Sequence, residues 1–255
     1  MKKSPWLVVS KVVNMSDIVL YLIDSRFPEE GRNRAVEQML RKKRKRFIAV
    51  FTKYDIADEK DFPIDRSLGA FALVSAKNYY GIQKLREKII IEGKRMGIER
   101  PRVGVIGYPN VGKSSIINAL RGKASARTSS QPGFTKGCQY IATEHFLLID
   151  TPGVIPRGEK DELKQIRLSV KNYNTKNFEE NVERLIAENP GAVEKFFSVP
   201  VSQDIMETLG KIAAKKGLLK RGGEPDMERA ARMVLKLYQD GKIKQAHPLQ
   251  TEKCA

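Results

Sequence analysis

The chain has 255 residues, enough for a full hydrophobic core arranged in one or two domains. Its 47 Lys and Arg against 30 Asp and Glu give a formal net charge of +17, so the expected partner is a polyanion such as RNA, DNA or an anionic membrane. Cys138 and Cys254 are far apart and His145 and His247 stand alone, which excludes a disulfide framework or a zinc site built from them and favours a reducing cytoplasm.

Apolar runs in the sequence are too short to cross a membrane. The longest candidate is residues 18–23, and the run at 6–9 is interrupted by Lys11 before a signal-peptide core could form. We therefore expect a soluble, cytoplasmic protein.

Short β-rich runs alternate with helical patterns over the first 150 residues. Strands buried on both faces are predicted at residues 18–23, 47–51, 71–74 and 103–106. The intervening helices are predicted at residues 34–41, 82–95 and 114–120, and a hairpin at 140–143 and 146–149. This alternation predicts an α/β domain with a mainly parallel sheet and helices on both faces, whose ligands sit beyond the carboxyl ends of the strands.

Helical patterns dominate after residue 160. The predicted helices are residues 161–170, 178–188, 192–197, 202–216 and 226–239. Ser202 and Asp226 are the predicted N-caps of the last two helices. We expect an α/β domain at 1–160, a helical linker at 161–198 and a small all-α C-terminal domain at 199–255.

Residues 107–114, with the sequence GYPNVGKS, match the G-x-x-x-x-G-K-S pattern of a P-loop. Small residues there let backbone N–H groups close around phosphate oxygens, while Lys113 reaches the β- and γ-phosphates and the Ser114 hydroxyl can bind Mg²⁺. On its own, the motif indicates a nucleoside triphosphate and leaves the base open.

Asp55, the last residue of a TKYD run, favours guanine as the base. A carboxylate only accepts hydrogen bonds, and guanine presents paired N1–H and N2–H donors where adenine has an unprotonated N1. We expect Lys53 to lay its aliphatic stem along the base, and Ala76 of an SAK run to donate its backbone N–H to the guanine O6. Thr52 stands where the usual N-K-x-D motif has Asn. Because a hydroxyl has fewer hydrogen-bonding groups than an amide, we expect Thr52 to tether the neighbouring loops less well.

The motifs stand in a permuted order, with TKYD and SAK before the P-loop and DTPG, residues 150–153, last. The run DSRFP at 24–28 with the pair at 32–33 is similar to a D-A-R-x-P…R-N signature, PGFT at 132–135 to a P-G-x-T switch, and 205–223 to the start of a C-terminal helical domain. In this order and content the chain resembles the circularly permuted Ras-like GTPases, and within them the YlqF/RbgA group of ribosome-assembly GTPases. The resemblance covers nearly the whole chain.

The resemblance implies a circularly permuted Ras-like P-loop GTPase domain that binds GTP or GDP with Mg²⁺ and hydrolyses GTP. It also implies the large ribosomal subunit or its precursor, with its rRNA, as partner; we expect a monomer without a membrane or DNA partner. The residues that we expect to bind the nucleotide are Thr52, Lys53, Asp55, Ser75, Ala76, Lys77, Asn110, Val111, Gly112, Lys113, Ser114, Ser115, Asp150 and Gly153.

Phosphoryl transfer requires charge neutralisation around the γ-phosphate, and the expected catalytic residues are Lys113, Thr135 and Gly153. Lys113 stabilises charge that develops on the β/γ oxygens, and the Gly153 backbone N–H senses the γ-phosphate. Ser114 and Thr135 are the expected Mg²⁺ ligands, with Asp150 holding a Mg²⁺-bound water.

Val154 stands where Ras and Gα place the glutamine that orients the attacking water. Because a valine cannot hold a water, we expect slow hydrolysis unless another group completes the site. The resemblance implies two substitutes, a potassium ion held partly by Asn110 and a histidine near the N-terminus. Asn110 is present, whereas no histidine precedes His145. We therefore expect stimulation by potassium and by ribosomal particles.

Two basic stretches are candidate RNA-binding surfaces. One puts six like charges at the predicted end of a helix, more than the helix dipole requires, and the other flanks a loop that we expect to be mobile. Their residues are Arg41, Lys42, Lys43, Arg44, Lys45 and Arg46, and Lys215, Lys216, Lys220 and Arg221. Solvated helix ends are the alternative for both stretches, and a nuclear-localisation signal for the first.

Three function classes remain open at this point. The favoured one is a GTP-driven assembly factor for the large ribosomal subunit, whose DTPG loop leads directly into the C-terminal domain and lets nucleotide state move it. The second is the GTPase domain of a tRNA- or rRNA-modification factor, although no second group of Cys, His or carboxylates appears outside the first domain. Asp55 and the SAK run argue against the third, an ATP-dependent kinase or motor.

Overall fold

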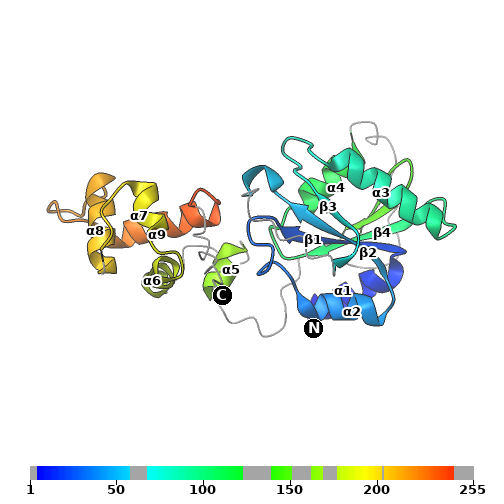
Figure 1. The fold of residues 1–255 in the computed structure, drawn as a ribbon, viewed down its shortest axis with the longest axis horizontal. Coiled ribbons are helices and arrows are strands. Elements are labelled where there is room, and N and C mark those ends of the chain that lie inside the picture. The colour runs from blue at the N-terminus through cyan, green and yellow to red at the C-terminus, as the bar shows by residue number, and fades with distance from the viewer. Residues whose placement is uncertain are drawn as a thin grey trace, which may run out of the picture. The chain divides into compact units, whose positions relative to one another are not determined.

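The structure is a computed structural model that describes residues 5–57, 68–122, 139–150, 162–168, 177–202 and 204–243. The chain divides into two compact units, Met1–Lys160 and Asp161–Ala255. Figure 1 shows the α/β first unit and the helical second unit.

The first unit is built on a six-stranded sheet of order β3-β2-β1-β4-β6-β5. The strands are β1 (Ile18–Asp24), β2 (Arg46–Thr52), β3 (Phe71–Leu73), β4 (Arg102–Gly107), β5 (Gln139–Ala142) and β6 (Leu147–Asp150). Neighbouring strands are parallel except for β5 and β6, which form an antiparallel pair. The predicted mainly parallel sheet and its terminal hairpin are therefore confirmed.

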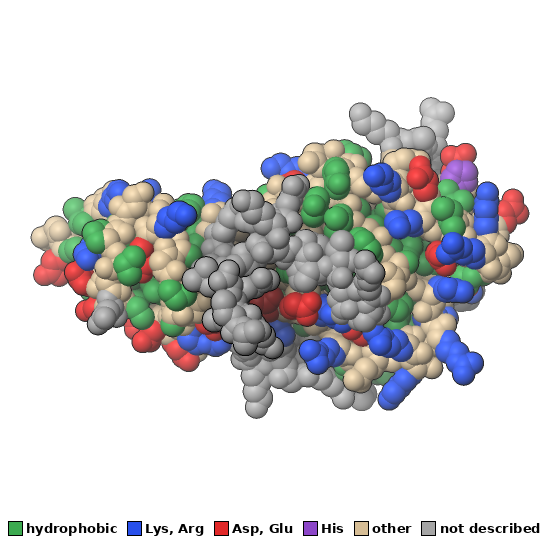
Figure 2. Space-filling model, viewed as in Figure 1, with side chains coloured by type: hydrophobic (Ala, Val, Ile, Leu, Met, Phe, Trp, Pro, Cys, Tyr) green, Lys and Arg blue, Asp and Glu red, His purple; other side chains and the backbone are tan. Residues whose placement is uncertain are grey.

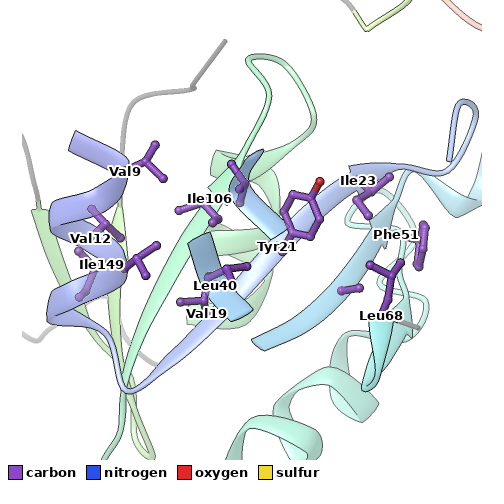
Figure 3. Packing of buried hydrophobic residues seen from close by; sticks show 13 residues of the cluster. Val9, Val12, Val19, Tyr21, Ile23, Leu40, Phe51, Leu68, Ile106 and Ile149 are labelled. Carbon is purple, nitrogen blue, oxygen red and sulfur yellow. The ribbon is translucent and has the colours of Figure 1, made fainter. Parts of the chain in front are cut away.

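Helices cover both faces of this sheet. Figure 1 shows α1 (Pro5–Met15) and α2 (Arg34–Lys42) on one face and α3 (Ile82–Arg95) and α4 (Lys113–Arg121) on the other. Because both faces are covered, every residue of β1 is buried, as its unbroken apolar sequence predicts. Figure 3 shows Val9 of α1 and Leu40 of α2 in the same cluster as Val19 and Tyr21 of β1.

Helix α1 is missing from the sequence-based prediction. Its valines are β-branched and have a low intrinsic helix propensity, so the segment does not stand out as a helix. Val9, Val12 and Val13 nevertheless recur at helical spacing and are fully buried. That spacing is the signal that identifies α1, and burial against the sheet outweighs the propensity.

The R-N pair of the signature builds the start of α2. Asn33 is the N-cap, and its side chain accepts a hydrogen bond from the Val36 backbone N–H. The Asn33 backbone N–H donates to the Tyr21 hydroxyl, whose pKa is raised because the group is buried. Arg32 forms a two-point ion pair with Glu37, with N–O distances of 2.8 and 2.9 Å. Arg32 and Asn33 therefore stabilise the start of α2 and join it to β1.

The second unit is helical. Its helices are α5 (Glu162–Arg167), α6 (Phe178–Glu188), α7 (Ala192–Phe197), α8 (Ile205–Lys215) and α9 (Met227–Gln239). Helices α5, α6 and α8 each pack on α9. Two of these, α5 and α6, lie in the stretch that we expected to be a linker. No helix in the described ranges combines the length and the apolar character needed to span a bilayer.

The predicted N-cap of α8 is wrong, whereas that of α9 is confirmed. Asp204 caps α8 by accepting a hydrogen bond from the Met206 backbone N–H at 2.8 Å. A carboxylate is favoured there by the helix dipole, and the Ser202 hydroxyl instead bonds the Asp204 backbone N–H and the Glu207 side chain. Asp226 accepts from the Arg229 backbone N–H at 3.0 Å.

The segment between α8 and α9, which we expected to be a mobile loop, forms a small hairpin. Leu219 pairs with Pro225, and the Lys220 backbone N–H donates to the Glu224 carbonyl at 2.8 Å. Gly222 closes the turn with a φ of 111°, which an L side chain rarely adopts. We call residues 218–226 the α8–α9 hairpin.

Candidate nucleotide-binding site

The P-loop joins the end of β4 to the start of α4. Lys113 is the first residue of α4, and Asn110 and Gly112 both have left-handed backbone conformations, with φ of 56° and 101°. Asn and Gly are the residues that tolerate this conformation best. The resulting turn directs the backbone N–H groups at the start of α4 to the end of the sheet, where a phosphate can bind.

Gly107 must be small because two neighbours crowd it. A Cβ atom there would lie 2.9 Å from the Leu22 carbonyl oxygen and 3.0 Å from the Val111 side chain. The P-loop therefore closes tightly over β1 and β4.

Lys113 is almost fully buried, and its ammonium group donates to the Tyr108 carbonyl at 3.3 Å. The next two residues, Ser114 and Ser115, are exposed at the first turn of α4. The Ser114 hydroxyl is a hard oxygen donor beside the phosphate position and suits Mg²⁺, which keeps most of its other ligands from phosphate and water. Within the described residues, no group of three or more His, Cys, Asp or Glu side chains is placed to hold a metal ion.

Thr52 ties the P-loop to the centre of the sheet. Its hydroxyl donates to the Val111 carbonyl at 2.6 Å, and the Ile23 carbonyl lies 3.3 Å away. One hydroxyl hydrogen can serve only one acceptor at a time, so the shorter bond to the P-loop dominates. Thr52 therefore tethers the P-loop through one short hydrogen bond, to the backbone carbonyl of the buried Val111.

Lys53 binds a carboxylate that sequence reasoning did not assign to the site. Its ammonium nitrogen lies 2.8 Å from Asp24 Oδ2, and Asp24 also receives two guanidinium hydrogen bonds from Arg26, at 2.8 and 2.9 Å. We call Asp24, Arg26 and Lys53 the ion triad. Its three charges come from the ends of two neighbouring strands, because Asp24 pairs with Thr52 across β1 and β2.

Burial and charged partners act in opposite directions on the pKa values of Asp24 and Lys53. Asp24 is 2% exposed, and desolvation alone raises its pKa; the hydrogen bonds and charges of Arg26 and Lys53 outweigh it, and the net pKa is lowered. Desolvation lowers the pKa of Lys53 despite the attraction of Asp24. The sequence contains one signal for Asp24 and Arg26: both belong to the DSRFP run, which directly follows a predicted strand.

The two expected guanine-reading loops are joined by an aromatic stack. Asp55 is exposed in a short 3₁₀ turn (Tyr54–Ile56), and the Tyr54 ring stacks on Tyr80 with centroids 5.5 Å apart. The Tyr54 backbone N–H also donates to the Val74 carbonyl at 3.2 Å, next to Ser75. Ala76 follows directly in the same loop, and Lys77 is exposed.

All these groups lie at one edge of the sheet. Leu22 pairs with Gly107 across β1 and β4, and Asp24 pairs with Thr52 across β1 and β2, so the carboxyl ends of the three central strands coincide. Asp150 ends β6, although its side chain is not described. Thr135, Gly153 and Val154 lie outside the described residues.

Lys43 and Lys45 of the first basic stretch have structural partners. Lys43 donates to the Asn14 side chain at 2.6 Å, and Lys45 donates to the Ser16 carbonyl at 2.7 Å, at the end of α1. The side chains of Lys42 and Arg44 are exposed and make no hydrogen bond or ion pair with other described residues. Lys43 and Lys45 thus hold the end of α1, whereas Lys42 and Arg44 are exposed to a ligand.

The second basic stretch divides in the same way. Lys215 donates to the Ser198 carbonyl at 2.7 Å, and Lys216 lies 5.7 Å from the centre of the Phe197 ring. Lys220 and Arg221 are exposed in the α8–α9 hairpin, where their side chains form no ion pair within the described ranges.

Comparison with known proteins gives matches along most of the chain. Residues 102–189 match the profile of a family described as 50S ribosome-binding GTPase. An uncharacterised GTP-binding protein of Methanocaldococcus jannaschii is 37% identical over 244 residues, which cover 92% of this chain and 65% of that protein. Nucleolar GTP-binding protein 2 of Neurospora crassa is 35% identical over 257 residues, which cover 94% of this chain and 41% of that protein. The chain thus spans less than two thirds of the length of these relatives.

Solved structures match the fold. The GNP-bound YlqF of T. maritima has a TM-score of 0.62 and 24% identity, and the match covers 92% of each chain. The GDP-bound form of the same protein has a TM-score of 0.65 and 23% identity, with 96% of this chain and 99% of that chain covered. The chain therefore shares its fold with those structures.

Proposed function

We propose that this chain, a YlqF-like circularly permuted GTPase, binds GTP and GDP, hydrolyses GTP, and acts as an assembly factor on the large ribosomal subunit. The observation that carries the proposal is the convergence of the P-loop, Thr52 and Asp55 at one edge of the sheet. An adenine-specific enzyme has no use for an exposed carboxylate at the position of Asp55.

The residues of the P-loop supply most of the chemistry. The N–H groups at the start of α4 bind phosphate oxygens, and Lys113 stabilises charge on the β/γ oxygens as the terminal bond breaks. Asp55 accepts hydrogen bonds from the guanine base, and Ala76 donates to its O6. Mg²⁺, held by Ser114 and Thr135, would neutralise charge on the phosphates. Gly153 would sense the γ-phosphate, and Asn110 would hold a potassium ion that compensates for Val154.

The partner is inferred from charge. A formal net charge of +17 favours a polyanion, and the name of the family matched by residues 102–189 points to the large subunit. Lys42, Arg44, Lys220 and Arg221 are the exposed cations of the two basic stretches that lack partners within the described residues. We assign them to rRNA contact and expect the protein to act in the cytoplasm as a monomer.

Co-sedimentation with purified large ribosomal subunits tests the proposal. The chain should pellet with subunits more tightly in the presence of a non-hydrolysable GTP analogue than with GDP, because γ-phosphate contacts order the loop that leads into the second unit. A parallel titration should show binding of GTP and none of ATP. Equal affinity for both bases, or no affinity for subunits in either nucleotide state, would contradict the proposal.

A further inference from the structure

The exposed face of α3 carries a row of side chains that neither basic stretch includes. Its members stand four, three and four residues apart, so they align along one side of the helix. They are Lys84, Lys88, Ile91 and Arg95, all exposed. The opposite side of the helix is buried against the first unit, through Ile82, Leu85, Ile89 and Gly93. We call the exposed members the α3 row.

The lysines of this row are available to a ligand. Lys84 and Lys88 form no ion pair with any residue in the described part of the chain. Two acidic residues lie beside the row. Glu87 accepts a hydrogen bond from Gln83 at 3.3 Å, and Glu92 pairs with Arg95, a member of the row, at 2.7 Å, so the two lysines are the cations of the row without an ion-pair partner among the described residues. Figure 2 shows many Lys and Arg side chains on the visible face of the first unit.

The row connects two other features of the first unit. At the C-terminal end of α3, Glu92 also lies 3.9 Å from Arg46, the last residue of the first basic stretch. At the N-terminal end, α3 follows the loop that carries Lys77, Tyr79 and Tyr80. The 14 residues of α3 span about 20 Å between these ends. We call the row with Lys77, Tyr79 and Arg46 the α3 band.

Tyr79 holds an aromatic ring out in solvent. Its φ of 59° is left-handed, a conformation that is unfavourable for a bulky side chain, and the residue is 62% exposed. The loop is tight two residues further on, since a Cβ atom at Gly81 would lie 2.0 Å from the Leu73 carbonyl oxygen. Strained backbone conformations cluster at functional sites, which makes this exposed ring a candidate for ligand contact.

We propose that the α3 band binds single-stranded RNA, with phosphates along Lys84 and Lys88 and a base stacked on Tyr79. Exposed cations with an interspersed aromatic ring are the features that bind single strands, because base faces are accessible there and are hidden in a duplex. Ile91 adds an apolar contact in the row. The inference rests on the proposed function only in taking ribosomal RNA as the source of the strand.

Fluorescence anisotropy of a labelled single-stranded oligoribonucleotide, measured with the full chain, tests the cationic part. Lys88→Glu should weaken binding about tenfold at low salt and lower the slope of log affinity against log salt by about 0.7. Lys94→Glu is the matched control, because it makes the same charge change on an exposed lysine of α3 roughly a quarter turn from the row. It should have a small effect, and both variants should bind GDP normally if they are folded.

Substitution of Tyr79 tests the stacking. Tyr79→Asn keeps a residue that tolerates positive φ and removes the ring, so it should weaken single-strand binding about tenfold and leave binding of an RNA duplex unchanged. Tyr79→Phe keeps the ring and should bind like the wild type.

The outcomes separate this inference from the proposed function. If the wild type binds RNA while Lys88→Glu behaves like Lys94→Glu and Tyr79→Asn binds normally, the α3 band is excluded and another surface carries the RNA. A second outcome would also overturn the inference: polyglutamate of equal charge displaces the RNA, and Tyr79→Asn has no effect on binding. The α3 band would then be assigned to an acidic protein partner. A wild type that binds neither RNA nor ribosomal subunits would remove the proposed function itself.

Discussion

Two aspartates of the proposed nucleotide site have opposite surroundings. Asp55 is exposed in a short turn, where its carboxylate is free to meet a base. Asp24 is 2% exposed and binds Arg26 and Lys53. Burial and partners, rather than residue type, therefore distinguish the carboxylate proposed to read the base from the one that supports the neighbouring strand ends.

Asp55→Asn should weaken GTP binding and create affinity for xanthosine triphosphate. The change replaces one carboxylate acceptor by an amide donor, and xanthine has a carbonyl where guanine has its amino group. The loss should reach about a hundredfold in GTP affinity, because a guanine donor loses its hydrogen bond to a charged carboxylate and meets an amide donor instead. Fluorescence titration with both nucleotides measures the change, and unchanged GTP affinity would contradict the role of Asp55.

Asp24→Asn should destabilise the first unit by about 3 kcal/mol near neutral pH, since removal of one partner strands the other buried charges. The folded-state pKa of Asp24 is lowered, so its stabilisation is present above the unfolded-state pKa of about 3.9 and lost as pH falls through the folded value. Urea unfolding at several pH values should show the difference between wild type and variant shrinking below about pH 4. A difference that is independent of pH would assign the effect to packing.

At the scale of elements, the P-loop is held by its neighbours as much as by its own sequence. Thr52 on β2 bonds the Val111 carbonyl, and Leu22 of β1 lies against Gly107. The strand ends therefore set the curvature of the loop before any nucleotide binds.

Thr52→Val should weaken binding of both GDP and GTP about fivefold to tenfold. Valine keeps the shape but leaves the buried Val111 carbonyl without its donor, a loss of about 1 kcal/mol or more. Thr52→Ser retains the hydroxyl and should bind nearly as well as the wild type. Calorimetric titration of GDP compares the three proteins, and equal affinities would show that the tether does not shape the phosphate site.

Potassium should speed turnover of GTP relative to sodium, and Asn110→Gly should abolish the difference while largely sparing GDP affinity. Glycine accepts the φ of 56° at this position without strain, whereas alanine would add a backbone penalty. Phosphate release in matched potassium and sodium buffers gives the two rates. Equal rates for the wild type would remove the ion from the mechanism.

At the scale of the whole molecule, the permuted order of the motifs places the second unit directly after the last of them. The DTPG run precedes that unit in the chain, so the proposed γ-phosphate sensor is covalently joined to the helices that carry the α8–α9 hairpin. Under the proposed function, nucleotide state and partner binding are linked in this way, and a ligand shifts such an equilibrium only by its differential affinity for the two states.

Lys220→Glu combined with Arg221→Glu should weaken binding to large-subunit particles in both nucleotide states and flatten its salt dependence, because fewer counterions are released. The GTPase rate without ribosomes should not change. Lys195→Glu with Lys242→Glu is a control of equal charge change at exposed lysines outside the hairpin. Co-sedimentation across a salt series makes the comparison, and a hairpin variant that matches the control would assign both residues to solvent.

The sequence by itself determined the permuted GTPase fold, because short β-rich apolar runs alternate with helical patterns, as in a parallel sheet covered by helices, and the motifs stand at the ends of those runs. Asp55 and Lys113 could be assigned as candidate site residues from the sequence, because each belongs to a short local motif. The partners of Lys53 and Thr52, the structural use of Lys43 and Lys45, and the burial of α1 required the tertiary structure. Each of these depends on segments that lie far apart in the chain and meet only when the strands are paired and their neighbouring ends exclude water.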